Sequence, residues 1–565
     1  MRQLYLFLSL FFMTLASKAQ IVNIPDANLK AKLLAANASN TIASTASPTF
    51  VEPFTYIYWQ FSTYNSIDSN NDGEIQVSEA QAIKVLQLQN SNISDLTGLE
   101  AFANLEFLNV YYNPITNINT SQNSALRGLY CGHGQLSSID VSQNPNLVML
   151  DCYDGQITSL NLEQNSNLKV LRFYGNQLGS IDVSHNINLK ELSVTGSLIN
   201  SLDVSANTAL IVLRCGFNQL NNLDVTQNTA LTELYCMGNQ LTTIDISHNT
   251  ALTSLYIYNN QLTNIDLTQN SNLNSLIIYH NSLTSLDVSS NPALHNLICS
   301  NNQLTTLNLT ANQNLSYVDC SYNQLETFLF NNCARLNSVV CSHNLLTSLA
   351  ATNLPNITEI DCQYNNLTSL DLTGSGNSLG TLFILDCGYN NLTTINTNVM
   401  ALAEGARISC WNNPNLTTIL AKNGAQFQDG SPHEPPYPNL FIGGTPNLQY
   451  ICVDSFNINF VQNLLSIYGY TGCTVDSACE LGTNQFENSK LVFSPNPAKD
   501  FLQLENTNQL IVKSINFYDV LGQIVIAIPN AENVSTIDVS DLKTGTYFIK
   551  VNTDKGTTNA KFLKK

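Results

Sequence analysis

The chain has 565 residues, of which 44% are hydrophobic and 11% are charged, and 41 acidic against 22 basic side chains give a net charge of −19. This composition excludes a disordered polyelectrolyte and a membrane-embedded bundle. Between residues 20 and 489, eleven basic side chains stand against 34 acidic ones. Such a negative balance repels phosphate backbones and anionic lipids, so we expect neither nucleic-acid binding nor membrane-surface binding.

The first nineteen residues have the pattern of an export signal. A positively charged start precedes an apolar run from Leu4 to Leu15, and the small residues Ser17 and Ala19 suit a signal peptidase. We therefore expect residues 1–19 to be removed as a signal peptide. No later segment has the roughly 18 unbroken apolar residues of a membrane helix, so we expect no membrane-spanning segment in the mature chain.

Residues 20–84 are predicted to form an N-terminal cap. Asp26 is a suitable first residue for a helix, and the apolar residues Leu29, Leu33 and Leu34 follow at helical spacing. The sequence therefore predicts a short helix at the start of this cap.

A loop rich in side-chain oxygens follows in the same cap. From Asp68 to Glu79, oxygen-bearing residues alternate, Gly73 allows a sharp bend, and the last residue is a glutamate that can offer two oxygens. The segment resembles the EF-hand calcium loop. The alternative is a loop of Asx turns that binds no ion. The resemblance implies that calcium is held by Asp68, Asn70, Asp72, the Glu74 carbonyl, Gln76 and Glu79.

Residues 85–452 repeat with a period of 21. Equivalent core positions follow one another at that spacing from Val110 to Cys362, and the unit L-x-x-L-x-C-x-x-N-Q-L-T-x-L-D-V-S-x-N-x-x is nearly complete from Leu231 to Asn249. The unit resembles the leucine-rich repeat family. Alternation in L-x-C predicts a short strand whose inward side chains are buried only when units stack, so we expect a curved solenoid.

We expect the polar columns of the repeat to have structural roles. The column that contains Asn239 lies where each strand turns away, and a buried amide ladder can satisfy the backbone groups there. The column that contains Asp245 is predicted to cap turns in solvent rather than to bind metal. A second asparagine column, from Asn123 to Asn312, is interrupted at Cys333, which we interpret as a local irregularity.

Most of the fourteen cysteines occupy an inward position of the repeat, where a small apolar side chain packs well. We therefore expect buried, reduced thiols there. Residues 453–479 are predicted to form a C-terminal cap, because the segment from Phe456 to Tyr470 is amphipathic at helical spacing. The disulfide candidates are Cys452, Cys473 and Cys479, and the sequence leaves their pairing open.

The period disappears after a predicted linker at residues 480–489. Short strand-like runs separated by proline, asparagine and glycine turns predict a small β-sandwich over residues 490–565. The whole chain is thus predicted to be mainly β: a leucine-rich-repeat solenoid with a helical N-terminal cap and a C-terminal immunoglobulin-like sandwich.

The C-terminal segment carries several motifs in a fixed order, beginning with Ser494-Pro-Asn-Pro-Ala and ending with the terminal run from Lys561 to Lys565. Between them lie Tyr-Asp-Val-Leu-Gly-Gln and Leu-Lys-Thr-Gly-Thr-Tyr. The segment resembles the type A sorting domain of the type IX secretion system of Bacteroidetes-type bacteria, although Gln523 stands where such domains often carry arginine. The resemblance implies export by the type IX machinery and a secreted or outer-surface location.

The strand positions that face solvent on the concave side are rich in aromatic residues. Such residues dominate binding hot spots, although strands also favour tyrosine for packing alone. Arg172 and Arg214 share these positions. The next position adds Tyr112, Phe217, Tyr322, Tyr364 and Tyr389. The candidate ligand-binding residues are Tyr111, Tyr130, Tyr153, Tyr174, Tyr235, Tyr256, Tyr258, Tyr279 and Trp411.

We expect no enzyme, because the seven histidines are scattered and no nucleophile, metal spacing or phosphate loop accompanies them. The leading hypothesis is a secreted or cell-surface leucine-rich-repeat protein that mediates protein–protein interaction or adhesion through its concave face. The alternatives are a glycan-binding adhesin and a passive surface structural protein.

Overall fold

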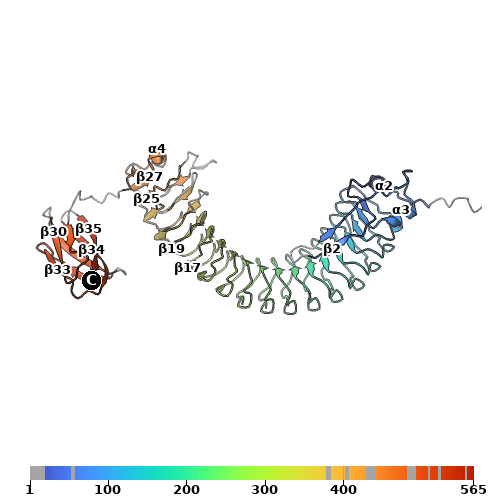
Figure 1. Ribbon diagram of the computed structural model, residues 1–565, viewed down its shortest axis with the longest axis horizontal. Helices are drawn as coiled ribbons and strands as arrows, with labels where there is room; N and C mark the ends of the chain where they lie inside the picture. The colour runs from blue at the N-terminus through green and yellow to red at the C-terminus, as the bar shows by residue number, and fades with distance from the viewer. Residues whose placement is uncertain are drawn as a thin grey trace, which may run out of the picture. The chain divides into compact units, whose positions relative to one another are not determined.

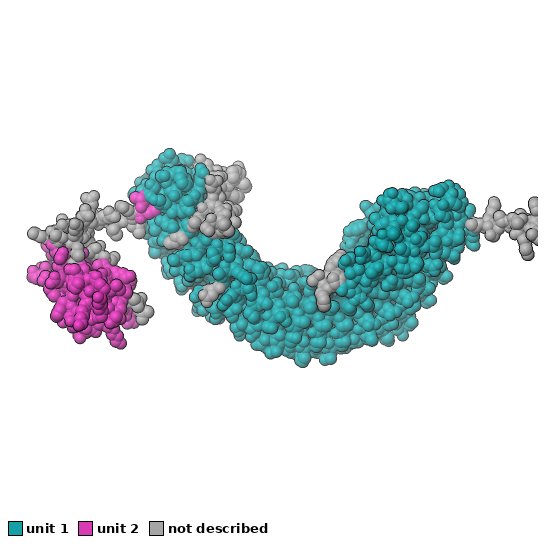
Figure 2. Space-filling model, viewed as in Figure 1, with its two compact units in different colours: residues 1–477 teal, residues 478–565 magenta. Residues whose placement is uncertain are grey.

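The chain forms two compact units, residues 1–477 and residues 478–565 (Figure 2). The expected signal peptide at 1–19 and the expected linker at 480–489 lie outside the residues that the structure describes. Among the described residues, no helix has both the length and the apolar character to cross a membrane. The structure, a computed structural model, describes residues 20–52, 58–331, 333–376, 384–398, 400, 406–427, 439–479, 491–506, 510–519, 523–553 and 556–565.

Short elements precede the repeats. Helix α2 (Ala27–Leu34) begins after Asp26, whose carboxylate accepts a hydrogen bond of 2.9 Å from the Leu29 backbone N–H, as the sequence predicts. Leu29 and Leu33 are buried in the same core as the first coils. The other elements of this part are β1 (Ala43–Ser44), β2 (Thr49–Val51), β3 (Tyr58–Gln60) and α3 (Val77–Ala82), whereas η1 (Leu99–Ala101) lies within the first repeats.

A long sheet with one short strand per coil lines the inner side of the curved solenoid (Figure 1). It has 18 strands, of which β1 pairs antiparallel with β4 and the others are parallel. Each strand pairs in register with the next coil, so Leu234 lies opposite Leu255. The parallel strands are β4 (Val85–Gln87), β5 (Phe107–Asn109), β6 (Gly128–Tyr130), β7 (Met149–Asp151), β8 (Val170–Arg172), β9 (Glu191–Ser193), β10 (Val212–Arg214), β11 (Glu233–Tyr235), β12 (Ser254–Tyr256), β13 (Ser275–Ile277), β14 (Asn296–Ile298), β16 (Tyr317–Asp319), β18 (Ser338–Val340), β20 (Glu359–Asp361), β22 (Ile384–Asp386), β24 (Arg407–Ser409) and β26 (Leu440–Phe441).

The later coils form additional parallel ladders that the sequence analysis did not predict. They pair β15 with β17, β19 with β21, and β23, β25, β27 and β28 in that order. The strands are β15 (Thr306–Asn308), β17 (Thr327–Leu329), β19 (Ser348–Ala350), β21 (Ser369–Asp371), β23 (Thr394–Asn396), β25 (Thr418–Ala421), β27 (Tyr450–Val453) and β28 (Thr474–Asp476).

A short helical segment follows β27 at the C-terminal end of the solenoid. It consists of η2 (Ser455–Asn457) and α4 (Ile458–Ile467), and it lies where the amphipathic pattern predicts a helix. Val461, Leu464 and Leu465 of α4 are buried in the solenoid core. The helix therefore covers apolar surface that the last coil would otherwise expose to water.

The inward cysteines behave as core residues. Twelve cysteines are free, and eleven of these are buried. Burial raises the pKa of the Cys215 thiol to about 12, so that thiol stays protonated at neutral pH. Of the three disulfide candidates, Cys452 and Cys479 are disulfide-bonded. The candidacy of Cys473 was wrong, since its thiol is free and half-buried.

We expect the native protein to react slowly with thiol reagents. Protonated, buried thiols are poor nucleophiles, so in the native state only the half-buried Cys473 is expected to be labelled within minutes by iodoacetamide at pH 8. Unfolding in guanidinium should expose all twelve free thiols, and reduction should raise the total to fourteen. Rapid native labelling of several cysteines, counted by mass spectrometry, would contradict the buried column.

An asparagine ladder joins neighbouring coils. The Asn239 side-chain amide donates to the carbonyl oxygens of Cys215 and Cys236 at 3.1 and 3.0 Å, and its Oδ1 accepts from the Leu220 N–H at 3.0 Å. Cys215 and Leu220 belong to the preceding coil. The ladder therefore satisfies the backbone where each strand turns away, as the sequence predicts.

The second asparagine column forms a buried ladder as well. Asn228 Nδ2 donates to the carbonyl oxygens of Val204 and Asn207, both at 2.9 Å. At the interruption, the Cys333 thiol takes the same place and lies 3.3 Å from the Leu309 carbonyl oxygen. The thiol therefore makes the contacts that an asparagine amide makes in the other coils.

Unit 2 contains two antiparallel sheets around one core. Leu502, Ile515, Phe517, Ile549 and Phe562 are buried between them. This arrangement agrees with a sandwich, whereas its likeness to the immunoglobulin fold stays a prediction. One sheet consists of β29 (Leu491–Ser494), β30 (Phe501–Asn506) and β33 (Thr536–Asp538). The other consists of β32 (Ile524–Ile528), β31 (Val512–Tyr518), β34 (Gly545–Thr553) and β35 (Gly556–Lys564).

Candidate binding surface

The inner face of the solenoid is built from side chains that alternate with the core. In β11, Leu234 and the following Cys236 are fully buried, whereas Tyr235 between them is half-buried and lies on the inner face. The same alternation places all nine candidate binding residues on this face, and each of them is half-buried.

The structure divides these nine residues into three groups. Tyr111, Tyr130, Tyr153 and Tyr174 form the first group, on the early coils. Tyr235, Tyr256, Tyr258 and Tyr279 form the second group, which we call the tyrosine patch. Trp411 lies apart, near the C-terminal end of the same face.

Rings in the tyrosine patch contact one another across coils. Tyr258 and Tyr279 stack with ring centres 4.4 Å apart and planes 10° apart, and Tyr235 meets Tyr256 edge to face at 4.7 Å. Burial raises the pKa of Tyr235 to about 12, with a further contribution from the neighbouring Glu233. At neutral pH the Tyr235 hydroxyl group is therefore uncharged and can donate a hydrogen bond.

The arginines between the two tyrosine groups are held by carboxylates. Arg172 makes a two-point contact with Glu191 at 2.7 and 2.9 Å, and Arg214 contacts Glu191 at 3.1 Å and Glu233 at 3.0 Å. Burial raises the pKa of Asp151, which lies 3.6 Å from Arg172, to about 6. Because this network neutralises its own charges, Arg172 and Arg214 do not make the middle of the face basic.

The β2–β3 hairpin covers the beginning of the face, which the sequence analysis did not foresee. Trp59 is buried in a cluster with Phe107, Met149 and Val170, which lie in β5, β7 and β8. A side chain at Gly128 would come within 2.9 Å of the Trp59 indole, so the glycine leaves room for it. Tyr130 packs against this cluster, so one ring of the early tyrosine group is partly covered by the hairpin.

Five exposed aromatic residues occupy the next position of the repeat. Tyr112, Phe217, Tyr322, Tyr364 and Tyr389 are 40% to 54% exposed. Every one of them has a left-handed backbone conformation, with φ between +51° and +55°. Glycine or asparagine stands at this position in other coils, which agrees with the preference of that conformation.

Histidines join this exposed column. His343 stacks between Tyr322 and Tyr364 at 4.1 and 4.3 Å, and Tyr364 stacks on Tyr389 at 4.1 Å. His133 stacks on Tyr112 at 4.1 Å. We expected the histidines to be scattered, but His133 and His343 follow Tyr112 and Tyr322 by 21 residues, which is the signal that places them in one column.

The predicted calcium loop is closed by hydrogen bonds of its own. Asp68 accepts from the Asp72 and Gly73 N–H groups at 3.2 and 3.0 Å, and Glu79 accepts from the Ser69 and Gln76 N–H groups at 2.8 and 3.0 Å. Gly73 has φ +80°, as the bend requires. A hydrogen bond from the Glu74 N–H lowers the pKa of Asp72.

The loop residues fit a hard cation in type, since they offer carboxylate, amide and carbonyl oxygens. Strand β3 precedes the loop where an EF-hand has a helix, and α3 follows it. No group of three or more His, Cys, Asp or Glu side chains placed to hold a metal occurs in the described part of the chain. Calcium binding therefore stays a prediction.

Calcium is expected to bind this loop and to stabilise the N-terminal cap, because a ligand held only by the folded state adds to its stability. Titration calorimetry should show heat that Glu79→Gln abolishes. Glu74→Gln is the matched control, since Glu74 would contribute its backbone carbonyl while its side chain pairs with Lys30 at 2.7 Å. An absence of heat with the unaltered protein would remove the site.

Family models match two parts of the chain. Residues 492–565 match the model described as "Secretion system C-terminal sorting domain", and residues 229–270 match "Leucine Rich repeats (2 copies)". The chain therefore contains leucine-rich repeats and a C-terminal secretion sorting domain. Both resemblances indicated by the sequence motifs are confirmed, and neither match includes the calcium loop.

Several solved structures are similar to this chain, among them three bacterial proteins. The functional domain of InlJ from Listeria monocytogenes, described as including a cysteine ladder, is 22% identical over 87% of this chain and 93% of that chain, with a TM-score of 0.49. An internalin (inlF) from the same species is 21% identical over 64% and 100%, with a TM-score of 0.46. YopM from Yersinia enterocolitica is 19% identical over 66% and 91%, with a TM-score of 0.43. No curated protein matches the chain.

Proposed function

We propose that this chain is an exported binding protein without catalytic activity, and that its inner face binds a protein partner. The sorting domain at residues 492–565 supports export by the type IX secretion machinery and a secreted or outer-surface location in a Bacteroidetes-type bacterium. A solenoid suits this role because its core is constant from coil to coil while the outward positions vary.

The tyrosine patch is the observation that carries this proposal. Its four rings lie on neighbouring coils between the arginine network and the C-terminal half of the face, and all four are half-buried. Rings that are already ordered by stacking lose little conformational freedom when a partner covers them. Large aromatic side chains of this kind are typical of hot spots at protein interfaces.

The same geometry favours a protein over a glycan as the occupant of the tyrosine patch. Tyr258 and Tyr279 each cover one face of the other's ring, so this pair offers ring edges and hydroxyl groups and less open ring face than two separate tyrosines. A sugar ring packs best on an open aromatic face, whereas a protein surface can use ring edges and neutral hydroxyl groups together. A passive structural protein would need no such patch.

Changing all four residues of the tyrosine patch to serine is expected to abolish capture of the partner from host or community lysates. Serine is a fair replacement because Ser193 and Ser321 stand at equivalent positions of other coils. The melting temperature should fall by only a few degrees, since each aromatic pair contributes roughly 0.5–1.5 kcal/mol beyond its buried area.

Ile187→Ser is the matched control, because Ile187 is an exposed apolar residue in a turn away from the strands. That variant should retain capture. If the fourfold variant still captures the same partner, the patch serves architecture instead of binding. Capture should also be tested with calcium and with chelator, because the loop would stabilise the start of the same solenoid.

A further inference from the structure

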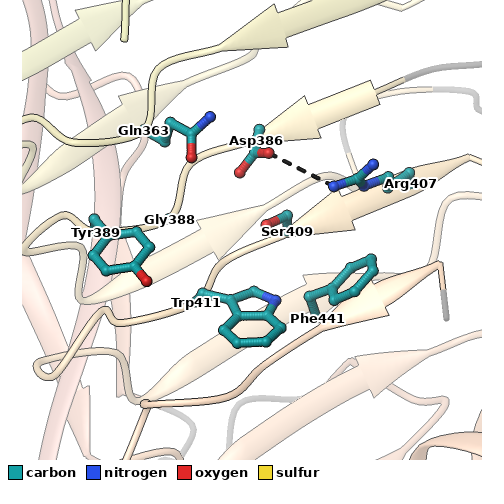
Figure 3. Close-up of a pocket in the computed structure, with 8 residues that line it drawn as sticks. All are labelled: Gln363, Asp386, Gly388, Tyr389, Arg407, Ser409, Trp411 and Phe441. Atoms are coloured by element: carbon teal, nitrogen blue, oxygen red, sulfur yellow. Dashed lines mark ion pairs between the residues drawn. The ribbon is translucent and has the colours of Figure 1, made fainter. Parts of the chain in front are cut away.

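A pocket lies on the inner face near the C-terminal end of the solenoid, outside the tyrosine patch. Strands β22, β24 and β26 supply its lining, and its volume is about 310 Å³. Figure 3 shows polar side chains along one wall and aromatic rings along another. The polar wall contains Gln363, Asp386 and Arg407, and the aromatic wall contains Tyr389, Trp411 and Phe441.

Trp411 differs from the tyrosines because no ring stacks on it from its own repeat position. Gly388 and Gly443 occupy that position in the coils on either side. A Cβ at Gly443 would lie 3.6 Å from Trp411 Cε3, and one at Gly388 would lie 3.2 Å from the Trp411 carbonyl oxygen. A Cβ at Gly443 would also lie 3.2 Å from the Tyr468 ring, and the two glycines themselves place no side chain against the indole. Phe441 touches the indole at a tilt of 34° and 5.8 Å between ring centres.

Tyr389 supplies a second aromatic surface to the pocket. It is the last ring of the stack that begins at Tyr322, and its inner face is covered by Tyr364 at 4.1 Å. The next coil has Asn412 at the equivalent position, so no further ring continues the stack. Figure 3 shows Tyr389 and Trp411 bordering the same opening.

Arg407 and Asp386 are far enough apart for a ligand group to bridge them. The shortest distance between Arg407 and Asp386 is 3.9 Å, which is too long for a direct hydrogen bond. The Arg407 guanidinium lies 5.0 Å from the centre of the Phe441 ring, which helps to hold it against the wall. A hydroxyl group between the pair can donate to the carboxylate and accept from the guanidinium.

These features favour one class of ligand over its competitors. An apolar side chain would strip water from Asp386 and Arg407 without replacing their hydrogen bonds. A cationic side chain would be repelled by Arg407, which already lies beside Asp386. A sugar ring offers hydroxyl groups to the polar wall and a face of C–H groups to the aromatic wall, where the ring quadrupole is negative.

We propose that this pocket binds one neutral pyranose ring of a glycan, with Trp411 against its C–H face and Asp386 and Arg407 on its hydroxyl groups. The volume suits a single ring, since it lies at the lower end of ligand-pocket sizes. Neutral sugars are favoured over acidic ones because Glu359, Asp361 and Asp386 outnumber Arg407 on this part of the face. This site is additional to the protein-binding role and does not depend on it.

The test uses the mature full-length chain on an array of neutral and acidic pyranose oligosaccharides, followed by titration with the methyl glycoside of the best terminal sugar. We expect binding to neutral glycans that Trp411→Ala weakens at least tenfold. Asp386→Asn should weaken it similarly, and it is the second variant in case Trp411→Ala disturbs folding. The fourfold serine variant of the tyrosine patch is the matched control and should bind the glycan normally.

Each outcome decides the proposal. Loss of glycan binding in both pocket variants, with melting temperatures close to that of the unaltered protein, supports it. Absence of any neutral glycan on the array, preference for acidic glycans, or binding that survives both pocket variants overturns it. Because the tyrosine patch and the pocket are altered by different substitutions, failure of the protein-binding role and failure of the glycan site give different results.

Discussion

Deleting residues 490–565 is expected to abolish appearance of the protein outside the cell and to leave a folded solenoid in the periplasm. The deleted segment contains the match to the sorting domain. The remaining chain keeps its own hydrophobic core, which is separate from the core of the deleted sheets. Without the sorting domain, the type IX machinery would have no signal to recognise, whereas the export signal expected at residues 1–19 would still direct passage through the inner membrane.

The measurement is cell fractionation of a type IX-competent Bacteroidetes host, with surface labelling by antibody. Folding of the retained solenoid should be checked by its circular dichroism and melting temperature after purification from the periplasm. A point variant in the sheet core, Phe517→Asp, is a useful companion, because Phe517 is fully buried and an unpaired carboxylate there should unfold the sorting unit alone. Normal surface display of the deletion variant would contradict the proposed route.

The repeat could be predicted from sequence because each of its columns has a simple physical role. Leucines and cysteines recur at one spacing and are buried, so the repeat pattern directly identifies the core residues. Asn239 and its equivalents satisfy backbone groups that every coil leaves unpaired at the same place. Asp245 caps its turn by accepting from the Ser247 N–H at 2.9 Å, which is again a contact between near neighbours.

Contacts between distant segments could not be predicted in the same way. Trp59 lies on Gly128 because the hairpin folds back over the sheet. Nothing in the sequence around either residue predicts this contact. The pocket beside Trp411 likewise depends on residues from successive coils whose spacing is no longer 21, since Trp411 follows Gly388 by 23 residues and Gly443 follows Trp411 by 32. Because this spacing is irregular, the residues around Trp411 cannot be aligned into columns from the sequence as the earlier repeats can.

The exposed aromatic column, whose residues have a left-handed backbone conformation, could not be predicted from residue preferences alone. Tyrosine and histidine are uncommon in that conformation, yet Tyr322, His343 and Tyr364 adopt it in succession. Their rings stack at 4.1 to 4.3 Å, and each contact is available only because the coils repeat in register. Stacking can therefore offset the conformational cost of a residue that would be unfavourable in an isolated turn.

Replacing Asn344 by alanine is expected to lower the free energy of unfolding by about 2–6 kcal/mol. The buried Leu325 N–H loses its partner, at about 1–3 kcal/mol, and two further buried hydrogen bonds are lost at about 0.5–1.5 kcal/mol each. The two carbonyl oxygens concerned each keep one amide donor, from Asn323 and Asn365. Asn344 is 6% exposed. Its amide donates to the carbonyl oxygens of Cys320 and Cys341 at 3.0 and 3.1 Å, and its Oδ1 accepts from the Leu325 N–H at 2.9 Å.

The control is Asn272→Ala, since Asn272 is exposed and donates a single hydrogen bond of 3.1 Å to the Thr250 carbonyl oxygen. That change should cost less than about 1.5 kcal/mol, the upper end for an ordinary hydrogen bond. Urea unfolding gives the free energy of unfolding of both variants, and hydrogen exchange identifies the coils that are destabilised. Because Asn344 bonds two successive coils, faster exchange should begin at Leu325 and in the strands beside it and spread to neighbouring coils, as expected of a chain of units stabilised mainly by their neighbours. Equal costs for the two variants would mean that the ladder is a consequence of coil stacking and not one of its causes.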